Sequence, residues 1–216
     1  EWPLASSLAR RLRHVTRGAP NETYEALSRA HLERFKAAAS GLRGSAPKDL
    51  CEEQWWALGR HYGLATPLLD WTQKPYIALF FALRGAVPAF EELASSTSDR
   101  FAVYRLSECP RLHTCADGDD LAVVRTPIDE LGRMQQQRGL FTWVKSHRYF
   151  DLRELLDATS RGDLLVMASV SVKLIPRALR DLDLHGIDHR LLFPDMYGAA
   201  GYANAMIDVE PPAASS

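Results

Sequence analysis

Hydrophobic residues recur at helical spacing through much of the first half of the chain. Between residues 21 and 41 an apolar side chain returns every three or four positions, which predicts a helix with one face on the core. The residues of this face are Tyr24, Leu27, His31 and Phe35. A shorter, basic helix is predicted over residues 8–15.

After residue 41 the sequence predicts two further helices with a loop between them. Asp49 and Glu52 have the spacing of a capping box, which predicts another helix directly after them. Residues 76–83 are apolar on every side, so we expect a fully buried helix that begins at Pro75. The polar and aromatic residues 61–72 are predicted to form a loop that this buried helix anchors.

Short alternating segments in the second half predict strands. The clearest alternation runs over residues 164–175, and a hairpin is expected from strands at 101–106 and 121–125. Further elements are predicted as a strand at 140–144 and as helices after residue 126, at 176–185 and at 198–207. Because strands and helices do not alternate regularly, the pattern favours the α+β class. We expect a helical N-terminal half packed on a mainly antiparallel sheet formed by the C-terminal half.

Composition narrows the class of protein. The chain has 216 residues, 46% of them hydrophobic and 25% charged, with a formal net charge of −1. We therefore predict one domain at residues 1–210 and a flexible tail at 211–216. No apolar run approaches the roughly 20 residues that span a bilayer, and the three cysteines form no CxxC pair. We expect a cytoplasmic protein with reduced thiols and no membrane partner.

Several familiar chemistries are absent from the sequence. It contains no GxSxG, GxxxxGK[ST], GxGxxG or HExxH motif. The acidic segment from His113 to Asp120 lacks the spacing of a calcium loop, so we expect no metal. Arg10, Arg11 and Arg13 could attract a nucleic acid, although a solvated helix face is the simpler interpretation.

One segment gathers side chains that suit a binding site. Within twelve residues the chain places His61, Tyr62, Asp70, Trp71 and Thr72. Polar groups on a rigidly anchored loop can hold a ligand. Alternatively, Asp70 and Thr72 only cap the following helix while the aromatic residues fill space. Spacing alone leaves both interpretations open.

The same segment resembles the FRG domain family, which is named for a Phe-Arg-Gly motif near its N-terminus. The family string QHYGLPTRLLDWT is similar to residues 60–72, and its following proline and helix to Pro75 and residues 78–82. An R-[IV]-x-x-Q-x-G-x-F element of the family is matched by Arg133, Met134, Gln137, Gly139 and Phe141. A late Leu-Phe-Pro-Asp is matched by residues 192–195.

The chain departs from the family pattern at several positions. Arg60 replaces Gln, Ala65 replaces Pro, and Pro67 replaces an Arg that could have met a phosphate or a carboxylate. The naming motif is absent, and residues 1–4 resemble the segment just downstream of it. We therefore expect the natural protein to extend upstream. An aromatic-Arg-Gly just before Glu1 would favour an enzyme, because the resemblance makes its Arg the expected clamp on a diphosphate.

In the order of its motifs, the FRG pattern resembles ADP-ribosyltransferases. The resemblance implies an ADP-ribosyltransferase-like fold, NAD as substrate, and a hydroxyl that orients the nicotinamide ribose, here Thr72. It implies Tyr62 or Trp71 as the aromatic that stacks on nicotinamide, and His61 as a donor to the ribose or a base for the acceptor. Thr66 and Phe141 complete the residues that we expect to bind NAD.

The catalytic acid is the open point of this resemblance. Gln137 stands where such enzymes carry Glu, and a neutral amide supplies no negative charge to an oxocarbenium-like transition state. Either Asp70 or Glu130 supplies it, and Asp70 is favoured because its segment also carries His61 and Thr72.

Two functions follow from these observations. The first is an NAD-dependent ADP-ribosyltransferase that modifies a macromolecular acceptor, with nucleic acid as a candidate. The second is a non-catalytic module that senses a nucleotide or peptide in a defence or stress-response protein. The acceptor, the oligomeric state and the pathway are left open by the sequence.

Overall fold

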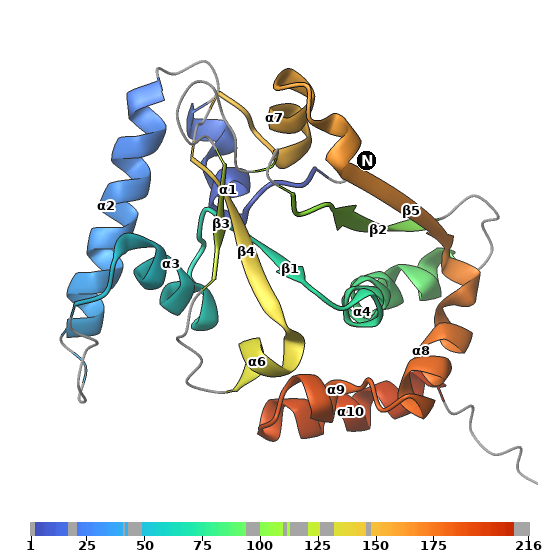
Figure 1. Ribbon diagram of the computed structural model, residues 1–216. Coiled ribbons are helices and arrows are strands. Elements are labelled where there is room, and N and C mark those ends of the chain that lie inside the picture. The colour runs from blue at the N-terminus through green and yellow to red at the C-terminus, as the bar shows by residue number, and fades with distance from the viewer. Residues whose placement is uncertain are drawn as a thin grey trace, which may run out of the picture. The chain divides into compact units, whose positions relative to one another are not determined.

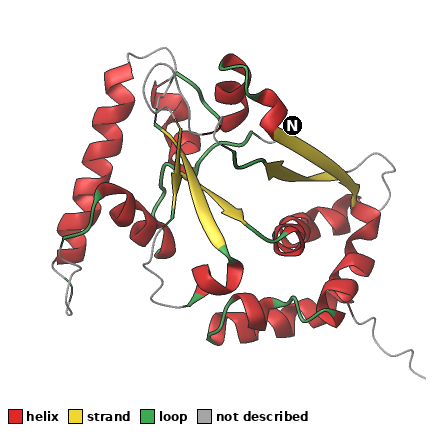
Figure 2. Ribbon diagram, in the orientation of Figure 1, coloured by secondary structure: helices red, strands yellow, loops and turns green. Residues whose placement is uncertain are grey.

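Most helices begin and end close to where hydrophobic spacing predicts them. The computed structural model describes residues 3–16, 21–40, 42, 49–93, 100–109, 112, 121–125, 132–145 and 148–209 (Figure 1). Helices and short strands are mixed along these residues, as Figure 2 shows. The antiparallel pairing of the α+β prediction is confirmed for two strands of the chain.

The chain divides into two compact units, each built from several segments. The first unit comprises Glu1–Asp70, Leu106–Ile128 and Leu140–Leu165. The second unit comprises Trp71–Arg105, Asp129–Gly139 and Val166–Ser216. The prediction of one domain at residues 1–210 stays a prediction. The expected tail at 211–216 lies outside the described residues.

Helices of the first unit pack through aromatic and main-chain contacts. They are α1 (Ser7–Thr16), α2 (Asn21–Ser40), α3 (Glu52–His61) and α7 (Leu152–Ala158), followed by the 3-10 helix η1 (Gly162–Leu164). The ring of His31 in α2 stacks on Trp56 of α3 with centroids 6.2 Å apart. The N–H of Leu152 donates to the carbonyl of Leu4 at 3.1 Å, which ties α7 to the start of the chain.

A three-stranded sheet has the order β1-β4-β3, with β1 at Leu68–Thr72, β4 at Gly139–Val144 and β3 at Leu121–Val124. Strands β3 and β4 are antiparallel, with Leu121 opposite Val144 and Val124 opposite Phe141. The predicted loop at residues 61–72 is therefore wrong for its last five positions. Residues 68–72 read LLDWT and do not alternate strictly between apolar and polar, so the pattern gave no strand signal, and a partner strand distant in sequence supplies the ladder bonds.

The second sheet corrects two further predictions. It has two strands, β2 (Arg100–Leu106) and β5 (Leu165–Ser171). The expected hairpin is wrong, because β2 pairs with β5 and β3 pairs with β4. The C-terminal half also does not form the sheets alone, since β1 and β2 both come from the first half.

The boundaries of two elements differ from the pattern. Strand β5 ends at Ser171, and the rest of the predicted strand is the 3-10 helix η2 (Val172–Leu174), which begins where the Ser171 hydroxyl accepts from the Lys173 N–H. Helix α3 is capped by Cys51, whose N–H donates to the side chain of Gln54 at 3.0 Å. The capping box predicted at Asp49 and Glu52 is therefore wrong by two residues.

The helices of the second unit are α4 (Pro75–Leu93), α6 (Arg133–Gln137), α8 (Ile175–Leu184), α9 (His189–Leu192) and α10 (Met196–Val209). Its core is formed by residues of α4, η2, α8 and α9. The core residues are Ile77, Phe80, Leu83, Ala86, Val172, Ile175, Leu179, Leu182 and Leu192. Helix α4 starts at Pro75 as predicted. It is not buried all round, because Tyr76 and Phe81 are exposed, so its apolar residues exceed what one packed face can cover.

No helix in the described ranges has the length and apolar content to cross a membrane.

Glycines let α10 approach the preceding helix closely. A Cβ added at Gly198 would lie 1.8 Å from the carbonyl oxygen of Phe193. One added at Gly201 would lie 2.6 Å from the ring of His189. The contact between α9 and α10 therefore depends on the missing side chains at these two positions.

Replacing Gly198 with Ala should destabilise the second unit. The new methyl group would overlap a backbone oxygen, and we expect a loss of about 1–3 kcal/mol in the free energy of unfolding, measured in urea. Gly85→Ala is the matched control. No described atom lies within 4 Å of a Cβ at Gly85, a helical position, and this substitution should be neutral or stabilise by up to about 1 kcal/mol. Equal effects of the two substitutions would contradict this packing.

Candidate functional site

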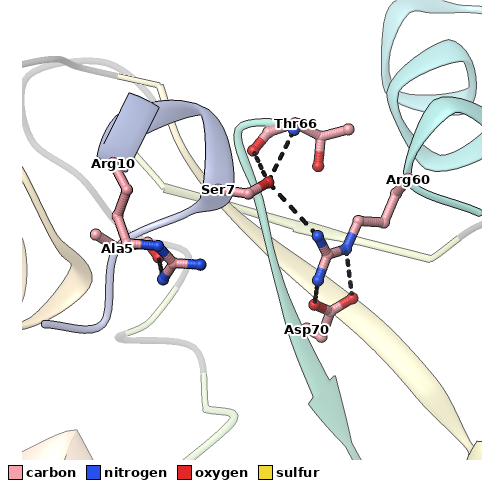
Figure 3. Close-up of polar contacts among 6 residues, drawn as sticks. All are labelled: Ala5, Ser7, Arg10, Arg60, Thr66 and Asp70. Atoms are coloured by element: carbon pink, nitrogen blue, oxygen red, sulfur yellow. Dashed lines mark hydrogen bonds and ion pairs between the residues drawn. The ribbon is translucent and has the colours of Figure 1, made fainter. Parts of the chain in front are cut away.

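A bidentate ion pair joins the end of α3 to β1. The Arg60 Nε donates to Asp70 Oδ1 at 3.2 Å, and its Nη2 donates to Asp70 Oδ2 (Figure 3). The two side chains are 34% and 51% exposed, so solvent reaches the pair. Asp70 is therefore a partly exposed carboxylate whose charge is compensated by the residue that departs from the FRG pattern.

Ser7 fixes the segment that precedes β1. Its hydroxyl accepts from the Thr66 N–H at 3.0 Å, donates to the Thr66 carbonyl at 3.3 Å, and lies 3.5 Å from Arg60 Nη1 (Figure 3). Thr66 itself is fully buried, and its own hydroxyl has no hydrogen-bond partner among the described residues. Thr66 therefore lies in the interior of the first unit, away from solvent.

The predicted His61 and Tyr62 contact one another at the end of α3. Their ring centroids are 5.5 Å apart with an interplanar angle of 87°. The Nε2 of His61 is buried and finds no hydrogen-bond partner within the described ranges. Tyr62 is 62% exposed, so much of this side chain faces solvent.

Thr72 and Gln137 meet in the second unit. The Thr72 hydroxyl donates to the Gln137 carbonyl at 2.6 Å and accepts from the N–H of Lys74 at 3.1 Å. Beside this contact the N–H of Gln73 donates to the carbonyl of Arg138 at 3.1 Å. The end of β1 is thus hydrogen-bonded to the turn that opens β4.

Both motif residues of α6, Arg133 and Gln137, are anchored to residues that precede α10. The side-chain amide of Gln137 donates to the Leu192 carbonyl at 3.0 Å. One helical turn earlier, Arg133 donates to Asp195 Oδ2 through Nε at 3.1 Å and through Nη2 at 2.6 Å. The Arg133 guanidinium also lies 5.2 Å from the ring centroid of Phe193. Its hydrogen bond is the main reason that the pKa of Asp195 is lowered.

The remaining predicted residues are less exposed or not described. Phe141 is 3% exposed and lies opposite Val124 in the ladder, so it belongs to the core of the first unit. Trp71 is partly buried in β1. Glu130 and the segment from His113 to Asp120 lie outside the described residues, as does the helix expected after residue 126.

The predicted residues thus meet in two pairs. His61 contacts Tyr62 in the first unit, and Thr72 contacts Gln137 in the second. Sequence reasoning missed Arg60 as the partner of Asp70, and it missed the pairing of Arg133 with Asp195. The spacing of Arg133 and Gln137, four residues apart on one helix, is the signal that could have indicated a common anchor.

Basic residues of α1 have contacts within the first unit. Arg10 Nη1 donates to the Ala5 carbonyl at 2.7 Å (Figure 3). The guanidinium of Arg13 lies 4.3 Å from the ring centroid of Phe150. Two of the three arginines considered for nucleic acid therefore also stabilise the fold.

The comparison with protein families matches the part of the chain that runs from α1 into α4. Residues 1–89 match the FRG domain. The recognition of this family from residues 60–72 is thereby confirmed. The FRG match ends before Arg133 and Asp195, so the later motifs rest on the resemblance of their residues alone. No curated protein and no solved structure matches the chain.

The Arg133–Asp195 pair should make stability depend on pH. In the folded chain the pKa of the Asp195 carboxyl is below its ordinary value of 3.8. The pair therefore contributes all of its stabilisation at a pH above the pKa of the unfolded chain, and this stabilisation is lost as the pH falls through the folded pKa. We expect the free energy of unfolding to decrease as the pH is lowered below about 4. The decrease should be less steep in Asp195→Asn, measured by urea unfolding from pH 3 to 7.

Asp181→Asn is the control for this pH dependence, because Asp181 is an exposed carboxylate of the same unit. The asparagine at position 195 can still accept the Gly198 N–H, so the cap of α10 is retained. Parallel pH curves for the wild type and Asp195→Asn would contradict the assignment.

Proposed function

We propose that the chain is an NAD-dependent enzyme of the ADP-ribosyltransferase type that transfers ADP-ribose to a macromolecular acceptor. The observation that carries the proposal is the 2.6 Å hydrogen bond from the Thr72 hydroxyl to the Gln137 carbonyl. This bond joins Thr72, whose hydroxyl the resemblance assigns to the nicotinamide ribose, to Gln137, which stands where the resembled enzymes carry their catalytic Glu.

The arrangement of β1 supports a role for Asp70 in the same chemistry. Side chains two residues apart on a strand share one face, so Asp70 and Thr72 lie on the same face of β1 and Trp71 on the other. In the proposed reaction the bond between nicotinamide and the ribose breaks, and positive charge develops on the ribose. Asp70 stabilises that charge, and the acceptor then attacks the ribose carbon and loses its proton.

The other predicted residues take roles that their surroundings allow. The Nε2 of His61 has no hydrogen-bond partner among the described residues, but it is buried, so a role as base for the acceptor requires the ring to turn toward solvent. Tyr62 is the better stacking candidate because most of its side chain is exposed. The acceptor class is left to experiment, and the basic face of α1 makes nucleic acid one of the classes to test.

One substitution at each residue of the ion pair distinguishes a catalytic role of Asp70 from a structural one. Asp70→Asn should lower ADP-ribose transfer by about 100-fold or more, because it removes the negative charge. Arg60→Gln restores the residue of the FRG pattern and leaves the carboxylate unpaired, so transfer should change by less than about tenfold. Transfer is measured by the mass of the modified acceptor, with folding checked by circular dichroism.

Glu33→Gln is the control, because Glu33 is an exposed carboxylate of the first unit that also forms an ion pair. It should leave transfer unchanged. If Asp70 only holds Arg60, both substitutions at the ion pair will reduce transfer equally. Transfer that survives Asp70→Asn would contradict the assignment of the acid.

A specific observation favours the second candidate, a non-catalytic nucleotide- or peptide-sensing module. Arg60 compensates the charge of Asp70, and Gln137 uses its neutral amide to bind the Leu192 carbonyl. Neither Asp70 nor the Gln137 position therefore offers a free carboxylate, and Glu130, the other acid considered, lies outside the described residues. This module would bind ADP-ribose saturably and release no nicotinamide from NAD.

A further inference from the structure

Two acid-free stretches meet in the second unit. Asp and Glu account for 27 of the 216 residues, or one in eight, yet neither occurs in residues 71–90 or 131–139. The hydrogen bonds of Thr72 to Gln137 and of Gln73 to Arg138 join these stretches. An anion placed here meets no carboxylate from either stretch.

Two cations of these stretches have no partner for their charge. Lys74 and Arg138 are exposed, and neither side chain makes an ion pair or hydrogen bond to the described residues. Arg133, by contrast, is already paired with Asp195. Because Gln73 is bonded to Arg138, the backbone next to Lys74 lies against that of Arg138. Two unpaired positive charges are thus held on adjoining turns.

An exposed aromatic ring follows two residues after Lys74. Tyr76 is 65% exposed and makes no ring contact within the described part of the chain. An exposed ring on the same segment as one of the two cations matches a ligand that carries both an aromatic group and a doubly charged anion. A nucleotide with a diphosphate has both features.

We propose that Lys74 and Arg138 bind the diphosphate of a nucleotide and that Tyr76 contacts its base. This inference rests on the proposed function in taking the ADP-ribose part of NAD as the ligand. The planar guanidinium of Arg138 can hold two phosphate oxygens at once, and Lys74 adds a compact charge on the adjoining turn. None of the three residues was assigned a role by the sequence motifs.

Calorimetric titration with ADP-ribose and with inorganic pyrophosphate tests the site. Lys74→Gln and Arg138→Gln should each weaken ADP-ribose binding about tenfold, and the double substitution about 100-fold, because each removes one charge-assisted contact. Arg138→Lys should recover part of the loss. Raising the salt concentration should weaken the wild type more than the double variant.

Two further variants sharpen the test. Lys173→Gln removes another exposed cation of the second unit, in η2, and should leave both affinities unchanged. Tyr76→Ala should weaken ADP-ribose binding and leave pyrophosphate binding as it was. Circular dichroism and urea unfolding establish that each variant is folded.

The outcomes separate this site from the proposed reaction. A wild type that binds neither ligand, or folded Lys74 and Arg138 variants with unchanged affinity, would overturn the site. Nicotinamide release with an unchanged KM for NAD in the double variant would overturn the site and leave the enzyme standing. Charge-dependent binding without nicotinamide release would support the site and favour the sensing module.

Discussion

Two hydrogen bonds at the end of β1 hold the second unit's candidate residues in place. The Thr72 hydroxyl and the Gln73 N–H donate to the carbonyls of Gln137 and Arg138, and the first bond joins residues 65 positions apart. A loop closed over that length costs conformational entropy, so the contact must be held by what surrounds it. Arg133 and the Gln137 side chain provide this by anchoring α6 to residues 192–195.

Electrostatics decides what this arrangement can do. In the proposed reaction Asp70 supplies the carboxylate, and in the structure the Arg60 guanidinium holds it in a bidentate pair. Where the FRG pattern has a neutral glutamine, this chain carries the cation of Arg60 beside its candidate acid. An exposed pair of this kind contributes little to stability, which leaves room for a substrate or an altered geometry to release the carboxylate. The same cation would suit a module that binds without turnover.

Sequence patterns predicted the helices, which are formed by hydrogen bonds between residues close in sequence. The amphipathic spacing in residues 21–41 and the proline at position 75 located α2 and the start of α4, because helix hydrogen bonds and caps connect near neighbours. Strand partners were not predictable in this way. Strand β2 pairs with β5 and not with the next strand in sequence, since a strand's partner is chosen by long-range packing.

In the candidate site, too, local features were predictable from the sequence and long-range contacts were not. The segment with His61, Asp70 and Thr72 was recognisable from its residue types, and the FRG match covers it. The burial of Thr66 and Phe141 was not recognisable, because burial depends on elements from other parts of the chain. Arg60 was noted only as a departure, since an ion pair to a residue ten positions later requires the strand that the pattern did not predict.

Nicotinamide release tests the central claim most directly. The protein is incubated with NAD and separately with DNA, RNA and protein acceptors, and the masses of the products are measured by mass spectrometry. The account predicts nicotinamide release together with an ADP-ribosyl adduct on one acceptor class. A folded sample that releases no nicotinamide and forms no adduct would contradict the enzyme.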